Sequence, residues 1–147
     1  MKPAYKGCIE LINKQIKELL GIYRDAAKLL DISESEFWVW YTLIAMDGEY
    51  TQQDICNMWS LPKQTVNTAI AHMRRRKYAY LEKVPGRRTH KRIRLTEEGM
   101  HYGARVIEMV AQAEERALVR VTPEEFSRVT TVFGKYIDTF RSELPTV

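Results

Sequence analysis

Residues 51–99, TQQDICNMWSLPKQTVNTAIAHMRRRKYAYLEKVPGRRTHKRIRLTEEG, are the stretch of the sequence that decides the fold. Thr51 is followed three residues later by Asp54, and this spacing lets the two residues cap the first turn of a helix. Ser60-Leu61-Pro62 ends that helix after about two turns, and proline favours the first position of a new helix. The stretch therefore begins with two helices joined by a tight turn, the second spanning about residues 62–77.

Apolar residues recur at three- and four-residue steps in both helices, which gives each helix one buried face. The predicted buried positions are Ile55, Met58 and Trp59 in the first helix, and Val66, Ile70, Met73 and the stem of Lys77 in the second. The polar residues of the second helix then share its opposite side. That side is free to contact another molecule.

A β-hairpin with a cationic tip follows the second helix. Residues 80–84 are predicted to form a strand and Pro85-Gly86 a turn. Residues 92–95 form the returning strand, which places Arg92 and Arg94 on one face and aliphatic side chains on the other. Two helices followed by such a hairpin are typical of a winged helix-turn-helix.

Amphipathic helices are expected on both sides of this module. Apolar residues at helical spacing predict a first helix over residues 5–30, and capping boxes at Ser33 and Thr122 begin two further helices. A fifth helix begins at Thr96 and carries the next apolar stripe. The predicted buried residues of the last helix are Phe126, Val129, Phe133, Ile137 and Phe140.

These elements predict a single domain, 1–147, that is mainly α-helical with a small β-hairpin. The winged helix-turn-helix module covers residues 33–96, and long helices at 5–31 and 97–147 flank it. A chain of 147 residues can bury a core without disulfides. Its two widely separated cysteines fit a reducing compartment better than a disulfide framework.

Positive charge is concentrated in residues 63–94. This segment holds eleven Lys and Arg against one acid, Glu82, a net charge of +10, although the whole chain carries only +4. The remainder is net negative and gains nothing from approaching a polyanion. The distribution predicts that one face of the molecule contacts nucleic-acid phosphates.

The first turns of the second helix carry side chains suited to base edges in the major groove. Asn and Gln can bond adenine through two atoms, Lys can donate to guanine, and the Thr methyl can contact the thymine methyl. We predict that the base-reading residues are Lys63, Gln64, Thr65, Asn67 and Thr68.

Cations at the end of this helix and along the hairpin are the predicted contacts to phosphate or to the minor groove. They are Arg74, Arg75, Arg87, Arg88, Lys91 and Arg92. Arginine is well suited to the minor groove, because the potential there is most negative. The arginines at the helix end have an alternative interpretation, since cations there complement the negative pole of the helix without any DNA.

The sequence of residues 51–99 resembles the MarR family of bacterial and archaeal transcriptional regulators, and the likeness covers essentially the whole chain. The matching motifs are T-x-x-D-I from Thr51, LPKQTVN from Leu61 and R-I-R-L-T-E-E-G from Arg92. The resemblance implies a homodimer, formed by the helices of the two termini, whose winged helices face successive major grooves of a palindromic operator. The implied function is sequence-specific binding of double-stranded DNA, and we expect a repressor.

The tip of the hairpin departs from the family pattern. The family usually places an aspartate before the wing arginine and orients that arginine by an ion pair, whereas the comparable positions here are Gly86 or Arg87. Arg88 is therefore the first candidate for the minor groove and Arg87 the second. The missing acid also removes a charge that would oppose phosphate.

An effector site has two candidates in the sequence. The helix that begins at Ser33 is rich in aromatic residues, and Phe37, Trp38 and Tyr41 can hold a small flat aromatic effector, although core packing explains the same residues. Cys8 lies at the start of the first helix, where the positive pole favours a thiolate, so it is a candidate redox site with a spectator thiol as the alternative. The histidines have no partners at ligand spacing, so neither a metal site nor a cofactor is predicted.

Enzymes and membrane proteins are the classes that the sequence disfavours. It contains no Gly-rich phosphate loop, no G-x-S-x-G and no run of about 18 apolar residues, and its start turns polar where a signal peptide has an apolar core. We expect a cytoplasmic protein without catalytic activity. The alternative function is a winged-helix module that binds protein or RNA without operator specificity, because a fold does not determine a function.

Overall fold

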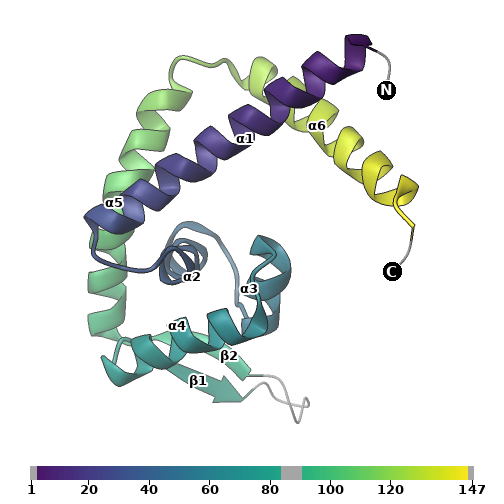
Figure 1. Ribbon diagram of the computed structural model, residues 1–147. Helices are drawn as coiled ribbons and strands as arrows, with labels where there is room; N and C mark the ends of the chain where they lie inside the picture. The colour runs from purple at the N-terminus through teal and green to yellow at the C-terminus, as the bar shows by residue number, and fades with distance from the viewer. Residues whose placement is uncertain (1–2, 84–90, 146–147) are drawn as a thin grey trace. The chain divides into compact units, whose positions relative to one another are not determined.

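The computed structural model describes residues 3–83 and 91–145. Its elements in chain order are α1 (Pro3–Leu29), α2 (Glu34–Ala45), α3 (Gln52–Trp59), α4 (Lys63–Arg75), β1 (Ala79–Lys83), β2 (Lys91–Leu95), α5 (Glu97–Leu118) and α6 (Pro123–Glu143) (Figure 1). This order confirms the predicted fold class, a mainly helical chain with one small hairpin. Over the described ranges, no helix combines the length and apolar character needed to cross a membrane.

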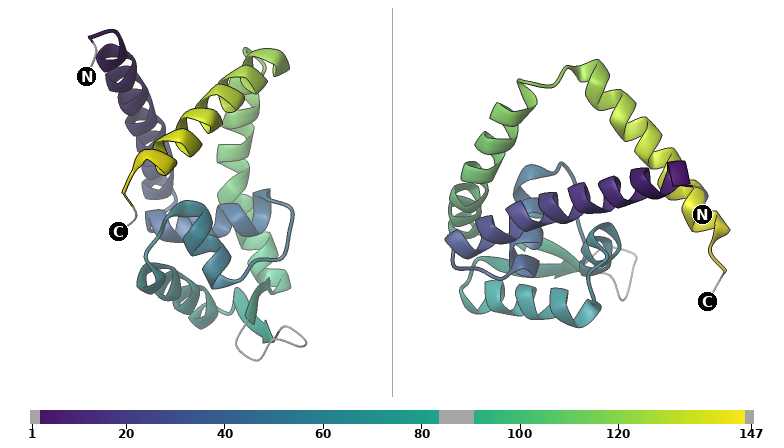
Figure 2. Two further views of the ribbon diagram at one scale, coloured as in Figure 1. Left: turned by 90° about the vertical axis from the view of Figure 1, so that its right-hand side faces the viewer. Right: turned by 45° about the horizontal axis from the view of Figure 1, so that its top comes forward.

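The chain divides into two compact units, residues 1–110 and 111–147, with the boundary inside α5. In the first unit α2 is the central helix, and it contacts α1, α3 and α4 (Figure 2). Five consecutive α2 residues, 36–40, are buried, as expected for a helix covered on every side. The largest fully buried side chains of the unit include Trp40 and Phe37 from this helix.

The turn between α3 and α4 is tight because Ser60 adopts a left-handed conformation with φ +52°, and its N–H donates to the carbonyl of Cys56. Pro62 was expected to be the first residue of α4, but the helix begins one residue later, at Lys63, and Pro62 is its N-cap. On α3 the prediction for Met58 was wrong: its side chain is 40% exposed, whereas Ile55 and Cys56 are buried. Because this helix has only eight residues, a rotation about its axis by the angle between two successive residues changes which side chains face the core.

The buried face of α4 comprises Val66, Ala69, Ile70 and Met73. The prediction for Lys77 was wrong, because α4 ends at Arg75 and Lys77 is exposed with φ +61°. A left-handed residue turns the chain away from the helix axis, so its side chain no longer continues the helical stripe.

The hairpin pairs β1 with β2 in antiparallel register from Ala79↔Leu95 to Lys83↔Lys91. A third extended segment joins it, since the N–H of Ile93 donates to the carbonyl of Tyr50 at 2.9 Å and Thr51 bridges Arg92. Ile93 is buried, whereas Arg92 and Arg94 lie on the opposite face of β2. The predicted division of the strand into a cationic and an aliphatic face is confirmed.

Two glycines let α5 approach the rest of its unit closely. A Cβ on Gly99 would lie 1.9 Å from the carbonyl oxygen of Tyr78, and one on Gly103 would lie 2.6 Å from the Trp40 ring. Neither position has room for a side chain. The start of α5 thereby lies close against α2 and against Tyr78, the residue that precedes β1.

The second unit contains α6, which begins with the predicted capping box: Thr122 accepts from the Glu125 N–H, and the Glu125 carboxylate accepts from the Thr122 N–H. The burial predicted for this helix was wrong, because none of its described residues is buried in the single chain. Phe126, Val129 and Phe140 are at least half exposed. The apolar stripe is present at helical spacing, but within the second unit its described residues are not buried.

Candidate nucleic-acid interface

The outward face of α4 is polar and accessible. Lys63, Gln64 and Thr68 are exposed, and Thr65 and Asn67 are partly so. The face exists because the four buried residues of α4 all point to the opposite side of the helix. All five predicted base-reading residues therefore lie on the described part of one helix, within its first two turns.

Two of these residues are in specific local environments: Thr68 is hydrogen-bonded within the helix, and Asn67 has a buried carbonyl oxygen without a described partner. The hydroxyl of Thr68 donates to the carbonyl of Gln64 at 2.9 Å, so its hydrogen is used within the helix. The Oδ1 atom of Asn67 is buried and has no hydrogen-bond partner among the described residues. An unsatisfied buried carbonyl is costly, and a side-chain rotation that exposes it would relieve this cost and bring the amide to the surface.

The three arginines at the end of α4 have different environments. Arg74 and Arg75 are exposed to solvent. The guanidinium of Arg76 lies 5.0 Å from the ring centre of Tyr78 and 5.1 Å from that of Tyr102, which are themselves stacked. Arg76 therefore anchors the end of α4 to α5, and the two arginines before it remain accessible to a phosphate.

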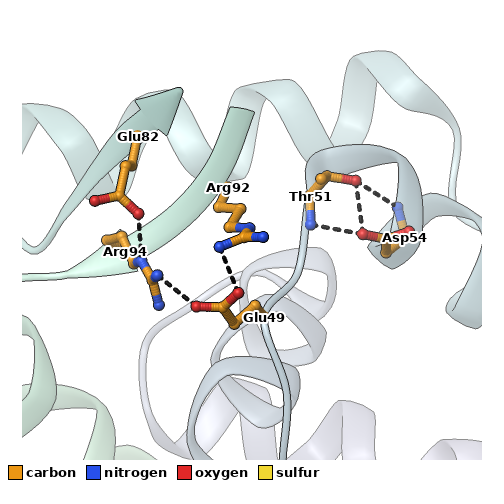
Figure 3. A network of polar contacts seen from close by, with 6 residues as sticks. All are labelled: Glu49, Thr51, Asp54, Glu82, Arg92 and Arg94. Carbon is orange, nitrogen blue, oxygen red and sulfur yellow. Dashed lines mark hydrogen bonds and ion pairs between the residues drawn. The ribbon is translucent and has the colours of Figure 1, made fainter. Parts of the chain in front are cut away.

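A network of four charged residues runs along one face of the hairpin, as Figure 3 shows. Glu49, in the loop before α3, contacts Arg92 through Oε2 and Arg94 through Oε1, each at 2.5 Å. Glu82 on β1 contacts Arg94 at 2.8 Å. Hydrogen bonds to Glu82 and then to Glu49 raise the pKa of Arg94. Arg92, a predicted DNA contact, is thus held by a carboxylate, while Lys91 is exposed.

Sequence analysis missed Glu49 because it lies outside the cationic segment. The available signal was its position directly before Tyr50, an extended residue that joins the hairpin edge and so brings Glu49 to the strand arginines. The two arginines predicted to enter the minor groove, Arg87 and Arg88, lie outside the described residues.

A second pair of residues was also missed, and it joins α2 to α4. The buried carboxylate of Glu36 lies 2.7 Å from Nδ1 of His72 and accepts a longer bond, 3.4 Å, from Nε1 of Trp40. Ser33 caps α2 by accepting from the Glu36 N–H, as predicted, but the Glu36 side chain points to α4. The pair borders a cavity of about 510 Å³ between the start of α2 and α4, which Gln64 and Thr68 also line.

The predicted effector residues form part of an aromatic cluster between α1, α2 and α3. Trp38 stacks on Trp59 with ring centres 4.1 Å apart and lies 4.8 Å from Tyr23, and Phe37 and Tyr41 pack edge-on against it. Phe37 and Trp38 are buried by these contacts. The cluster is therefore well packed without a ligand in it.

The two cysteines occupy different environments: Cys8 is exposed on α1, and Cys56 is buried on α3. Within residues 3–83 and 91–145, no group of three His, Cys, Asp or Glu side chains is arranged to hold a metal ion. The only predicted redox residue, Cys8, is thus accessible to solvent.

Comparison with solved structures bears directly on the fold. A MarR family regulator from Neisseria meningitidis superposes with a TM-score of 0.79 over 91% of this chain and 94% of its own, at 22% sequence identity. The chain has the MarR fold. A MarR family transcriptional regulator from Listeria monocytogenes, complexed with 26-mer DNA, has a TM-score of 0.69 at 16% identity, over 92% of this chain and 89% of its own.

The chain is also similar to a solved structure of the organohalide-sensing transcriptional regulator RdhR-CbdbA1625 in its 2,4-dichlorophenol-bound form. It has a TM-score of 0.61 at 16% identity, over 92% of this chain and 80% of its own. No protein-family model matches the sequence, and a search of curated proteins finds no match. At these low identities, the property shared with the other MarR-fold chains is the three-dimensional arrangement.

Proposed function

We propose that this protein is a homodimeric transcriptional regulator that binds a palindromic operator in double-stranded DNA. The observation that carries the proposal is the exposed polar face of α4, within a helix-turn-helix followed by a cationic hairpin. An α-helix with exposed Lys, Gln, Asn and Thr in its first turns can enter the major groove and contact base edges.

The charges around α4 support this function. Arg74 and Arg75 extend its exposed face toward the helix end, and Lys91 is exposed at the start of β2. Cations that flank a polar reading face position a protein on the phosphate backbone, while the face itself discriminates between sequences. We propose that Arg87 and Arg88, from the segment between the strands, complete this contact in the minor groove.

Dimer formation is supported by the uncovered apolar stripe of α6. Large apolar side chains rarely gather on a surface that remains exposed, and here Val129, Val132 and Phe140 are all more than half exposed. A second copy of the chain would cover them. A two-fold dimer also places two recognition helices about 34–36 Å apart, one turn of DNA, which matches two half-sites of a palindrome.

A small aromatic effector is the proposed release signal, and repression is the proposed effect. A MarR-fold neighbour is an organohalide sensor with a bound chlorophenol, and this chain has an aromatic cluster at Phe37, Trp38 and Tyr41. Because Trp38 and Trp59 are stacked there, an effector that enters the cluster must change tryptophan fluorescence. A saturable change on titration with planar aromatic acids supports this site, and its absence over a broad panel of such acids argues for core packing alone.

The decisive test is equilibrium binding to three nucleic acids across a salt series. These are a duplex from the region upstream of the protein's own gene, an unrelated duplex of the same length, and an RNA hairpin. A specific regulator prefers the first by about 10³-fold or more. Equal binding to all three, or to none, would instead support the alternative of an interaction module without operator specificity.

A further inference from the structure

We propose that Glu49 is a specificity-determining residue, which keeps Arg92 and Arg94 from binding phosphate on unrelated DNA. The inference rests on the proposed function and adds a role to a residue outside the DNA-contacting face. It is based on the two ion pairs that the single carboxylate of Glu49 forms with Arg92 and Arg94 of β2 (Figure 3).

The charges of the hairpin do not pair as its register alone would suggest. Glu82 lies directly opposite Arg92 in the β-ladder, yet its carboxylate binds the diagonal neighbour, Arg94. Arg92 binds Glu49 instead. Two cations and two carboxylates thus form a neutral cluster along the hairpin, whereas the other described charges of residues 63–94 are all positive.

The backbone of β2 does not depend on Glu49 for its position. Five register pairs join β2 to β1, and the Ile93 N–H donates to the Tyr50 carbonyl beside the cluster. All the charged side chains are between about one third and one half exposed, so the ion pairs contribute little to stability. Removing the Glu49 charge should therefore change the electrostatics of the hairpin and leave its fold intact.

The same exposure allows a phosphate to compete for the arginines. An arginine bound to a carboxylate can contact phosphate only after that carboxylate is displaced, or against its repulsion. Base contacts with operator DNA can offset the free energy of displacing the carboxylate. Unrelated DNA is bound only through its phosphates and makes no such contacts. Glu49 thereby lowers non-specific affinity more than specific affinity, which is a form of discrimination by repulsion.

The test compares Glu49→Gln with Glu82→Gln, which makes the same change of charge in the same network but leaves Glu49 to hold both arginines. Affinity for an unrelated duplex is measured from low to physiological salt, and thermal unfolding is measured in parallel. We expect Glu49→Gln to tighten this binding and to steepen the slope of log affinity against log salt by about one to two units. Adding Arg92→Gln to Glu49→Gln should make this slope shallower again by about one unit, because one freed arginine is removed. All variants should unfold at similar temperatures.

The outcomes separate this inference from the proposed function. If the wild-type protein binds no duplex even at low salt, the proposed function fails. If the wild-type protein binds but Glu49→Gln matches Glu82→Gln in slope and affinity, the role of Glu49 is refuted. Weaker binding by Glu49→Gln at unchanged thermal stability also refutes it, because Glu49 would then position the hairpin for contact.

Discussion

Glu36 on α2 and His72 on α4 are joined by a contact of 2.7 Å between the carboxylate Oε2 and the imidazole Nδ1. Glu36 is almost fully buried, whereas the His72 side chain is 41% exposed. The pair is a polar link between α2, the central helix of the unit, and α4, the helix that carries the reading face. Because a hydrogen bond is directional, the pair constrains the rotation of α4 about its own axis in addition to the apolar packing.

His72→Ala should destabilise the fold by about 1–3 kcal/mol, because it leaves a buried carboxylate with only the long Trp40 bond. Glu36→Gln should cost less, since the amide oxygen still accepts. Denaturant unfolding of both single variants and the double variant measures the coupling between them. Strict additivity of the two effects would show that the pair contributes nothing beyond its separate parts.

Asn67→Ala should leave stability unchanged or slightly improved, because it removes a buried carbonyl that has no described partner. It should also reduce discrimination at one base pair by about 1–3 kcal/mol if Asn67 reads adenine in the complex. Binding to a set of single-site operator variants measures this loss. If the variant kept the wild-type base preference at every operator position and was also less stable, Asn67 would be a core residue and not a base contact.

Gly99→Ala should destabilise the protein by about 1–3 kcal/mol, because the new Cβ would meet the Tyr78 carbonyl and force the backbone to move. Gly21→Ala on α1 is the matched control. No atom lies within 4 Å of its Cβ position, so alanine should stabilise that helix by about 0.5–1 kcal/mol. Thermal unfolding of both variants checks the signs, and equal signs would contradict the close approach of α5.

Val129→Glu should convert the protein to a monomer and weaken operator binding. The new charge would lie in the apolar stripe of α6 that is proposed to pack against a second copy of the chain. Ser127→Glu makes a similar addition two positions earlier, on a different side of α6, and should leave the dimer intact. Sedimentation at micromolar concentration and circular dichroism report assembly and helicity separately. A monomeric wild-type protein under the same conditions would remove the basis of the proposed dimer.

Local signals in the sequence were sufficient for most of the secondary structure. The capping boxes at Thr51 and Thr122 begin α3 and α6, and both strands lie within one residue of their predicted bounds. These features depend on residues three to four positions apart, so they can be predicted from the sequence alone. The polar face of α4 was predictable for the same reason, since it follows from the periodicity of one helix.

The sequence by itself determined the helix-turn-helix, the hairpin and the concentration of cations, because each arises from neighbours along the chain. Only the tertiary structure decided which of those cations are accessible. Glu49 reaches Arg92 across 43 positions and Glu36 reaches His72 across 36, and no periodicity reports such pairings. The cover for α6 was likewise beyond the sequence pattern, because a stripe shows that a face is apolar but not what buries it.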